Sequence, residues 1–263
     1  MLTVILRTCL RSKLDENIAG EFTRICGKDR RAMVLKCLKS LVISINRCSA
    51  KVWLVILDDN SDQDFLDDMD YILKRCDFDV SVVSLKAPDG VASFNHSAYE
   101  QFRMASEVDG LVYSVEDDYL HDEDAIETML TAYSHLSNRF PQDKVVIFPF
   151  DCPFRYETGR EEPTVLLHDG SRYWRQVNHT TNTFLTKGKF IKEHFSVYAK
   201  LALEYPSVNE SNTINKLYRS FFNMGGQLTV FNPIPSVAYH LSYAEPVAIK
   251  TDSLSWKSLW DSI

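Results

Sequence analysis

Two buried-strand patterns in this sequence each end in a cluster of acidic residues. Residues 111–115, Leu-Val-Tyr-Ser-Val, run directly into Glu116-Asp117-Asp118, and residues 52–57 run into the acidic segment 58–62. In a parallel sheet the carboxyl ends of the strands meet along one edge, which is where such sheets bind ligands. Carboxylate oxygens there can hold a divalent cation and, through it, a phosphate-bearing ligand. We therefore expect the two clusters to form one site.

Each cluster has a specific chemical use. Asp59 can accept a hydrogen bond from the N3–H of uracil or thymine, whereas N3 of cytosine has no proton to donate. Glu116, Asp117 and Asp118 would repel one another unless a cation offsets their charge, and Asp118 is the best single candidate for the metal ligand. The alternative for Asp59 is an acidic turn that caps a helix. The alternative for residues 116–118 is a solvated acidic loop.

The apolar pattern predicts alternating strands and helices that would position both clusters. Strands are expected at 3–6, 52–57, 80–85, 111–115 and 145–148, and helices at 32–45, 65–74, 93–106 and 122–136. Residues 150–180 read as loop, followed by an edge strand at 183–185, helices at 189–202 and 212–223, a strand at 228–231 and an amphipathic tail. This alternation predicts an α/β fold with a mainly parallel, doubly wound sheet. We expect one domain, 1–263, with a nucleotide-binding half (1–120) and an acceptor-side half with the C-terminal tail (121–263).

Composition argues against several kinds of partner. The 263-residue chain has a net charge of −7 and a pI near 5.5, whereas nucleic-acid binding needs clustered Lys and Arg, and anionic lipid attracts basic segments. The six cysteines form no CxxC pair or zinc-like spacing, which favours free thiols in a reducing compartment. No apolar run approaches the ~18–20 residues of a transmembrane segment, and the start, Met1–Leu6, is too short for a signal peptide. We predict a soluble, cytoplasmic protein without a transmembrane segment or nucleic-acid partner.

The order of these parts resembles the nucleotide-sugar glycosyltransferases of the GT-A fold, and is most similar to glycosyltransferase family 2. The resemblance covers the first half well, through Leu57-Asp58-Asp59-Asn60-Ser61-Asp62 and through Val115-Glu116-Asp117-Asp118, where the family carries its DXD element. It implies that Asp59 receives the nucleotide base and that Asp118 holds Mn²⁺ or Mg²⁺ on the diphosphate. Glu116 replaces the first Asp of the element, and its longer side chain suits a ribose or water-mediated role beside the metal. The other nucleotide-binding candidates are Arg7, Thr8, Asn95 and Asp117.

The second half resembles the family more loosely. Asn209-Glu210-Ser211, a helix, Gly225-Gly226, a strand and Pro233 follow the family's acid–helix–Gly–strand–Pro ending, with one acid where a Glu-Asp pair is usual. This implies Glu210 as the general base of an inverting displacement, with Asp169 and Asp151 as substitutes. His240 stands where some GT-A enzymes supply a second metal ligand, and an imidazole would favour Mn²⁺. The alternatives are an acid that complements a helix dipole and a structural histidine.

Aromatic residues stand beside cations in the second half; aromatic faces suit a sugar acceptor, and Arg side chains suit a diphosphate. The acceptor-binding candidates are Arg155, Tyr156, Arg172, Trp174 and Thr181, with ordinary packing as an equal alternative. We therefore predict a metal-dependent glycosyltransferase, hexosyl or pentosyl, that moves a sugar from a nucleotide-diphosphate donor, UDP by preference, to a hydroxyl acceptor such as a glycan. The rival is a non-catalytic nucleotide-sugar or carbohydrate-binding module of the same fold. The sugar, the acceptor and the choice between inversion and retention stay open.

Overall fold

The computed structural model describes residues 1–10, 29–140, 144–156, 163–220, 224–241 and 253–263. The strands are β1 (Leu2–Thr8), β2 (Val52–Asp59), β3 (Asp79–Leu85), β4 (Leu111–Glu116), β5 (Tyr119–His121), β6 (Lys144–Ile147), β7 (Leu166–His168), β8 (Tyr173–Val177), β9 (Phe184–Lys187), β10 (Leu228–Ile234) and β11 (Ala238–His240). The helices are α2 (Arg30–Asn46), α3 (Gln63–Leu73), α4 (Ser93–Glu107), α5 (Ala125–Arg139), α6 (Gly188–Glu193), α7 (Phe195–Glu204) and α8 (Ser253–Ser262), with 3₁₀ turns η1 (Pro153–Tyr156), η2 (Glu210–Asn212) and η3 (Ile214–Leu217).

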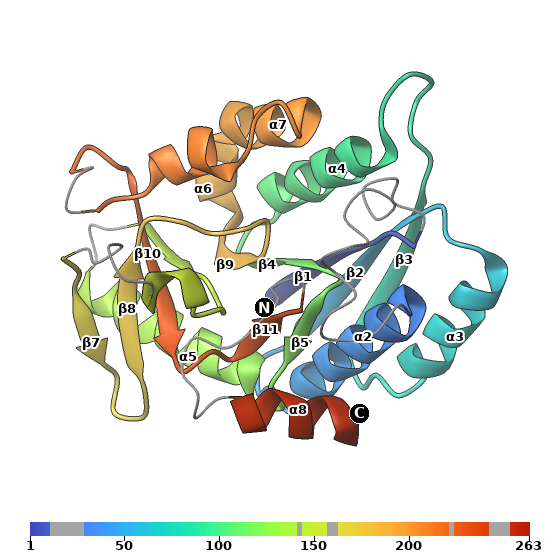
Figure 1. Ribbon diagram of the computed structural model, residues 1–263, viewed down its shortest axis with the longest axis horizontal. Coiled ribbons are helices and arrows are strands. Elements are labelled where there is room, and N and C mark those ends of the chain that lie inside the picture. The colour runs from blue at the N-terminus through green and yellow to red at the C-terminus, as the bar shows by residue number, and fades with distance from the viewer. Residues whose placement is uncertain (11–28, 141–143, 157–162, 221–223, 242–252) are drawn as a thin grey trace.

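A large twisted sheet forms the centre of the molecule (Figure 1). In the described ranges its nine strands follow the order β3-β2-β1-β4-β9-β6-β10-β8-β7, and β5 pairs with β11 in a separate two-stranded sheet. Strands β3, β2, β1 and β4 are parallel, and β9 runs antiparallel between β4 and β6. The predicted α/β fold with a mainly parallel sheet is therefore confirmed, and one continuous sheet contains strands from both halves of the chain.

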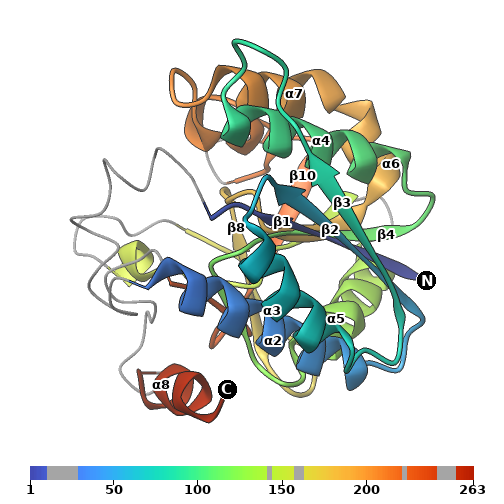
Figure 2. The same cartoon turned by 90° about the vertical axis from the view of Figure 1, so that its right-hand side faces the viewer.

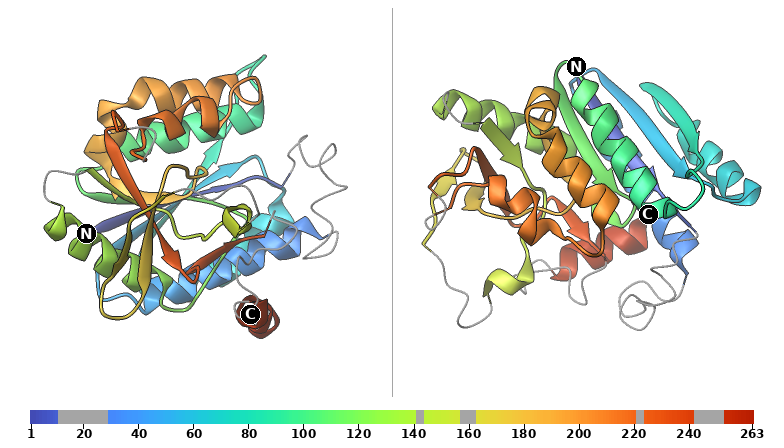
Figure 3. Two further views of the ribbon diagram at one scale, coloured as in Figure 1. Left: turned by 60° about the vertical axis from the view of Figure 1, so that its left-hand side comes forward. Right: turned by 90° about the horizontal axis from the view of Figure 1, so that it is seen from above.

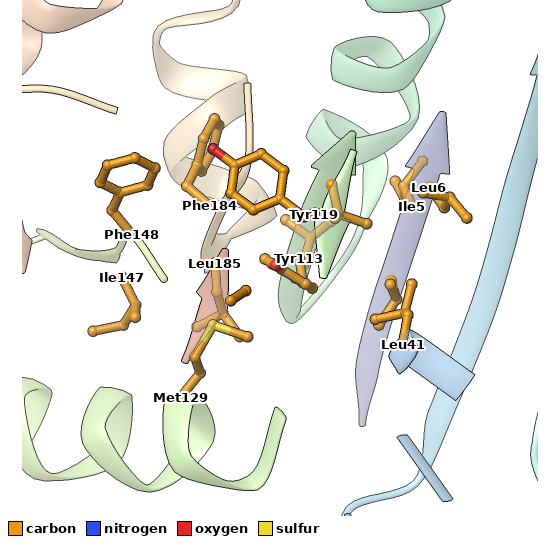
Figure 4. Close-up of a cluster of buried hydrophobic side chains, with 14 of the residues drawn as sticks. Ile5, Leu6, Leu41, Tyr113, Tyr119, Met129, Ile147, Phe148, Phe184 and Leu185 are labelled. Atoms are coloured by element: carbon orange, nitrogen blue, oxygen red, sulfur yellow. The ribbon is translucent and has the colours of Figure 1, made fainter. Parts of the chain in front are cut away.

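Helices cover both faces of this sheet. α4, α6 and α7 lie on one face, and α2, α3 and α5 lie on the other (Figures 1 and 2). Every residue of β1 is buried, as expected for a strand covered on both sides. Tyr113, Tyr119, Phe148 and Phe184 gather in the core between the layers (Figure 4). The acidic ends of the strands therefore project from a rigid, densely packed support.

The tail packs against its own domain, as its spacing indicated. Trp256 on α8 is 6% exposed. On α2, Lys36 Nζ donates to the carbonyl of Trp260 at 2.6 Å and lies over its ring, while Lys39 Nζ donates to the carbonyl of Ile263 at 2.7 Å. Two lysines thus satisfy carbonyls at the end of α8, where helix carbonyls have no partner within the helix. Among the described residues, no helix is long and apolar enough to cross a membrane.

Five sequence predictions in the second half are wrong. The strand at 183–185 is expected at an edge of the sheet, but β9 lies inside it, between β4 and β6. Residues 150–180 contain β7 and β8 rather than loop alone, and the helix expected at 189–202 is divided into α6 and α7 near His194. The helix expected at 122–136 begins later, at Ala125, because residues 122–124 form a turn between β5 and the helix, closed by the Ala125 N–H donating to the Asp122 carbonyl at 3.0 Å. The helix expected at 212–223 is replaced, in the part described, by η2, η3 and a bridge from Tyr218 to Leu228. A Cβ at Gly226 would come within 2.5 Å of backbone atoms of residues 218–219, so this close return needs glycine.

Candidate active site

The two acidic clusters flank the end of β1 at one edge of the sheet. In the parallel register Thr8 of β1 pairs with Asp58 of β2, and Arg7 pairs with Glu116 of β4. β1 is the middle strand of the three, so its end brings together segments that are distant in the chain: Asp58 is 50 residues from Thr8, and Glu116 is 109 residues from Arg7. This edge is the usual position of the ligand site in a parallel sheet.

The adjacent residues Asp58 and Asp59 are both buried but use their oxygens differently. Asp58 accepts from the Thr8 hydroxyl at 3.2 Å and from the Ser61 N–H at 3.1 Å, so both of its oxygens hold the turn. Asp59 accepts from the Ser93 hydroxyl through Oδ1. Its Oδ2 is buried and has no hydrogen-bond partner in the described part of the chain. Asp59 therefore offers a carboxylate oxygen to a ligand, and Asp58 does not.

Asp62, at the end of the same segment, caps α3 by accepting from the Phe65 N–H at 3.0 Å. The alternative interpretation of this acidic segment, a helix-capping turn, is thus right for Asp62. It does not account for Asp59, which makes no such bond.

Glu116, which is partly exposed, forms an ion pair with the buried Arg7. The Arg7 guanidinium donates to Oε1 at 2.8 Å and lies 4.4 Å from the centroid of the Phe94 ring, and the Asn182 amide donates to the same oxygen at 3.2 Å. Burial raises the pKa of Glu116, the charge of Arg7 opposes this, and the charge of Asp118 adds to it. Within the protein, therefore, Arg7 offsets the charge of Glu116.

Asp117 ties the start of α2 to the acidic edge. Its carboxylate accepts from the Cys9 N–H at 2.9 Å and from the Arg30 guanidinium at 3.0 Å. Burial raises its pKa, and the positive charge of Arg30 opposes the rise. Arg30 also donates to the Cys9 carbonyl at 3.0 Å, so the start of α2 is joined to the residue that follows β1.

Asp118 and His240 meet because β5 and β11 form a ladder. His240 pairs with Tyr119, and the Leu241 N–H donates to the Asp118 carbonyl at 2.9 Å. His240 Nε2 lies 3.0 Å from Asp118 Oδ2, and its ring stacks on Tyr119 at 4.6 Å. Burial lowers the pKa of His240, but the charge of Asp118 and its hydrogen bond, with the charges of Glu116 and Glu210, raise it overall.

This pair fits a cation such as Mn²⁺ in the type of its donors. A carboxylate oxygen and an imidazole nitrogen are ligands that Mn²⁺ accepts. Across the described ranges, no group of three or more His, Cys, Asp and Glu side chains is arranged to hold a metal ion. A cation here would have two protein ligands, Asp118 and His240, and a bound ligand would have to provide others.

Glu210 approaches the same edge from the second half. It begins η2, whose cap is the neighbouring Asn209, which accepts from the Asn212 N–H at 3.3 Å. The capping role is therefore filled by Asn209. Behind the larger effects of burial and nearer charges, the charge of Glu210 also raises the pKa of both Glu116 and His240, so its carboxylate acts on this cluster.

The two substitute bases hold loops instead. Asp151 is fully buried and accepts from Arg175 at 3.2 Å and from the Tyr156 hydroxyl at 2.5 Å. Asp169 accepts from two backbone N–H groups of the next turn and from the Trp174 indole at 2.6 Å. Burial favours the neutral form of Asp169, but these hydrogen bonds outweigh it and lower its pKa to about 2. A carboxylate so well satisfied is a poor proton acceptor at neutral pH.

The acceptor-binding candidates occupy varied positions. Trp174 is completely buried, and Arg172 donates to the Pro235 carbonyl at 2.7 Å. Arg155 contacts Asn178 and His179, and Thr181 bonds to the Tyr119 hydroxyl at 2.8 Å. Tyr156 is 43% exposed, and the Arg175 guanidinium lies 4.9 Å from its ring centroid. Among these side chains, Tyr156 is the one that presents an aromatic surface to solvent.

Sequence reasoning missed several contacts to the site. Ser93 and Phe94 at the start of α4 contact Asp59 and Arg7, and Asn182 contacts Glu116. Asn95, expected at the nucleotide, uses its amide to donate to the carbonyls of Ala202 and Tyr205. No local pattern marks these residues, because their roles arise from how α4 and the loop before β9 pack on the sheet.

No model of a known protein family matches the sequence, and no curated protein matches it either. A fragment of TarS from S. aureus shares 15% identity and a TM-score of 0.42, covering 88% of this chain and 59% of that one. The 4-diphosphocytidyl-2C-methyl-D-erythritolsynthase of Anaerococcus prevotii DSM 20548 shares 15% identity and a TM-score of 0.43, over 99% and 98% of the chains. The galactosyltransferase LgtC, in complex with donor and acceptor sugar analogs, shares 11% identity and a TM-score of 0.45, over 100% and 96%.

The chain spans 33% of the length of another TarS structure and 59% of the fragment. With TM-scores below 0.5, these likenesses give no information about substrate or mechanism. The observed sheet order, the helical layers and the acidic strand ends agree with the GT-A fold that the sequence resemblance implied. The protein is thus an α/β protein of GT-A-like, Rossmann-like architecture.

Proposed function

We propose that this protein transfers a sugar from a nucleoside diphosphate donor, preferably a UDP-sugar, to a hydroxyl group of an acceptor such as a glycan. One observation carries the proposal: Asp59, a buried carboxylate with an oxygen that has no partner among the residues described, lies at the same sheet edge as the Asp118–His240 pair. The first can accept from the N3–H of uracil, and the second suits the cation that accompanies a diphosphate.

The donor would lie across the end of β1. Asp59 would hold the base, and Asp118 and His240 would hold Mn²⁺ or Mg²⁺. When bound, the cation supplies positive charge that offsets the diphosphate. Arg7, which is 6% exposed, offers a further positive charge beside Glu116. It stands at the end of β1, between the end of β2 and the end of β4. These groups favour the departure of a nucleoside diphosphate, because they stabilise the negative charge that develops on it.

Glu210 would act as the general base. Its carboxylate accepts the proton of the acceptor hydroxyl while the hydroxyl oxygen attacks the anomeric carbon of the donor sugar. The bond between that carbon and the diphosphate oxygen breaks, and its electron pair leaves with UDP. Because attack comes from the side opposite the leaving group, the configuration inverts. A cytoplasmic site of action follows, as a proposal, from the cysteine pattern of the sequence.

Thermal stability with and without ligand tests the nucleotide and metal sites. UDP with Mn²⁺ at about 100 times its dissociation constant should stabilise the protein by ~2.7 kcal/mol, raising Tm by about 5–10 °C. CDP with Mn²⁺, and UDP with EDTA in place of Mn²⁺, should each raise Tm by less. Asp118→Asn should lose the Mn²⁺-dependent part, whereas Asp169→Asn, at the distant β7–β8 hairpin, should keep it.

Turnover separates the enzyme from a binding module. Incubation with a panel of UDP-sugars and acceptors should release free UDP, and Glu210→Gln should slow the release by roughly 10²–10⁴. A protein that shows no UDP-dependent stabilisation contradicts the proposal altogether. A protein that binds UDP-sugars but never releases UDP is the non-catalytic module instead.

A further inference from the structure

Tyr205, directly after α7, stands beside the acidic edge and has no part in the mechanism above. We propose that Tyr205 forms the wall of the pocket for the transferred sugar and determines which sugar is accepted. The inference rests on the proposed function, since it names a contact of the same donor. Its evidence is the chain of contacts that links this tyrosine to Arg7 and Glu116.

The first turn of α4 connects Tyr205 to the acidic cluster. The Phe94 ring packs against the Tyr205 ring with centroids 5.1 Å apart. The Arg7 guanidinium lies 4.4 Å from the centroid of the same Phe94 ring, and it donates to Glu116 at 2.8 Å. Tyr205 is therefore separated from the ion pair by one aromatic ring.

The backbone of Tyr205 is held in place by the next residue of α4. Asn95 is 7% exposed, and its amide nitrogen donates to the Ala202 carbonyl at 2.8 Å and to the Tyr205 carbonyl at 2.9 Å. Both amide hydrogens thus bind the end of α7. α4 and α7 lie side by side over the sheet (Figure 3), and the aromatic contact of Phe102 with Tyr198 at 5.1 Å joins them further along. This support holds the backbone of Tyr205 through its carbonyl.

The charges of the site act on the phenol of Tyr205. Burial raises its pKa most, the charges of Glu210 and Glu116 raise it further, and Arg7 opposes them. Tyr205 therefore stays protonated at neutral pH and remains an O–H donor among carboxylates. The ring is half-buried, so part of it remains accessible to a ligand. A tyrosine offers both an apolar face for the C–H groups of a sugar and a hydrogen bond for its hydroxyls.

The position along α4 separates sugar from base. Ser93 contacts Asp59, where the base is proposed to bind, and the following two residues contact Arg7 and Tyr205. Tyr205 is thus linked, through the Phe94 ring and Arg7, to Glu116 and not to Asp59. A side chain at that point contacts the sugar and leaves the base untouched.

Binding of UDP and of UDP-sugars to variants tests this assignment. Isothermal titration with Mn²⁺ would use UDP, UDP-glucose, UDP-galactose and UDP-N-acetylglucosamine. Tyr205→Ala should weaken the preferred UDP-sugar about 3- to 12-fold, from the loss of an aromatic contact, and leave the affinity for UDP unchanged. Tyr205→Phe keeps the ring against Phe94 and should retain most of the affinity while narrowing the preference among the sugars. The control is Tyr173→Ala, which removes a 51% exposed tyrosine on β8 and should leave the affinities for UDP and for the UDP-sugars unchanged.

The outcomes are distinct. An equal loss of UDP and UDP-sugar affinity, or no loss of either, in the Tyr205 variants overturns the inference. If Tyr205→Ala does not fold, Tyr205→Phe decides, since an unchanged ranking of the sugars then contradicts the role of the phenol. A wild-type protein that binds UDP but favours no UDP-sugar over another also refutes it. A wild-type protein that binds no UDP refutes the proposed function itself.

Discussion

Replacing Asp59 or its neighbour Asp58 with asparagine should change stability in opposite directions. Asp59 is 2% exposed and its Oδ2 has no partner among the described residues, so the folded protein bears the cost of desolvating that oxygen. An unsatisfied buried group costs about 1–3 kcal/mol, and more when charged. Asp59→Asn removes the charge and keeps an oxygen for the Ser93 hydroxyl, so the free energy of unfolding should rise by roughly 1 kcal/mol.

Asp58→Asn is the matched control, because this carboxylate is equally buried and fully used. Its two oxygens accept from the Thr8 hydroxyl and the Ser61 N–H. An amide group must turn its NH₂ towards one of these donors. The free energy of unfolding should therefore fall by about 1–3 kcal/mol.

The effect on UDP binding should be the reverse of the effect on stability: Asp59→Asn should weaken binding, and Asp58→Asn should keep the preference for UDP. A hydrogen bond to a charged group contributes about 1.5–3 kcal/mol, so Asp59→Asn should weaken UDP roughly 10- to 150-fold and reduce its advantage over CDP. Asp58→Asn should retain the advantage of UDP over CDP. Urea denaturation measures the stabilities, and titration calorimetry with Mn²⁺ measures the affinities. If Asp59→Asn destabilises the protein as Asp58→Asn does, and UDP binding is unchanged, the reasoning is refuted.

Three further perturbations probe the ion pair, a core histidine and the base. Arg7→Met leaves the largely buried Glu116 without its cation and should lower the free energy of unfolding, measured with urea, by about 3–5 kcal/mol. Adding Glu116→Gln should restore most of this loss. Losses that simply add in the double variant would argue against coupling. Burial lowers the pKa of His121 to about 3, far below its unfolded value, so its stabilising contribution is complete above that unfolded value and is lost as the pH falls towards 3. Between pH 7 and pH 5 the wild type should therefore lose about 2 kcal/mol more than His121→Gln, and parallel profiles would contradict this. Glu210→Gln should lower kcat by roughly 10²–10⁴ with unchanged UDP affinity, and an equal loss of both would assign Glu210 to donor binding.

The first half of the fold could be predicted because its signals are long. Residues 52–57 and 111–115 are continuous apolar runs, as strands covered on both faces require, and the helices between them carry clear helical periodicity. The prediction of the second half is less successful because its signals are short. β5, β7 and β11 span three residues each, too few to show a period, and their pairing depends on partners distant in the chain.

The acidic residues of the site could be found from the sequence, but the state of their oxygens could not. Asp58 and Asp59 are identical in type and adjacent in sequence, yet the turn uses both oxygens of Asp58 and leaves one oxygen of Asp59. Likewise, Asp151 and Asp169 look as suitable for a base as Glu210 until their hydrogen bonds are known. Donors such as Arg175 and Trp174 come from tertiary packing, which no local pattern encodes.

The ladder of three residue pairs between β5 and β11 makes the Asp118–His240 pair sensitive to single-residue insertions and deletions. Successive side chains of a strand point to opposite sides, so sliding β11 by one position would exchange His240 for Tyr239 beside Asp118. A length change in the chain around β11 would therefore remove the imidazole while leaving every residue of the cluster present in the sequence. Comparisons between related chains should align this segment by its pairing rather than by residue type.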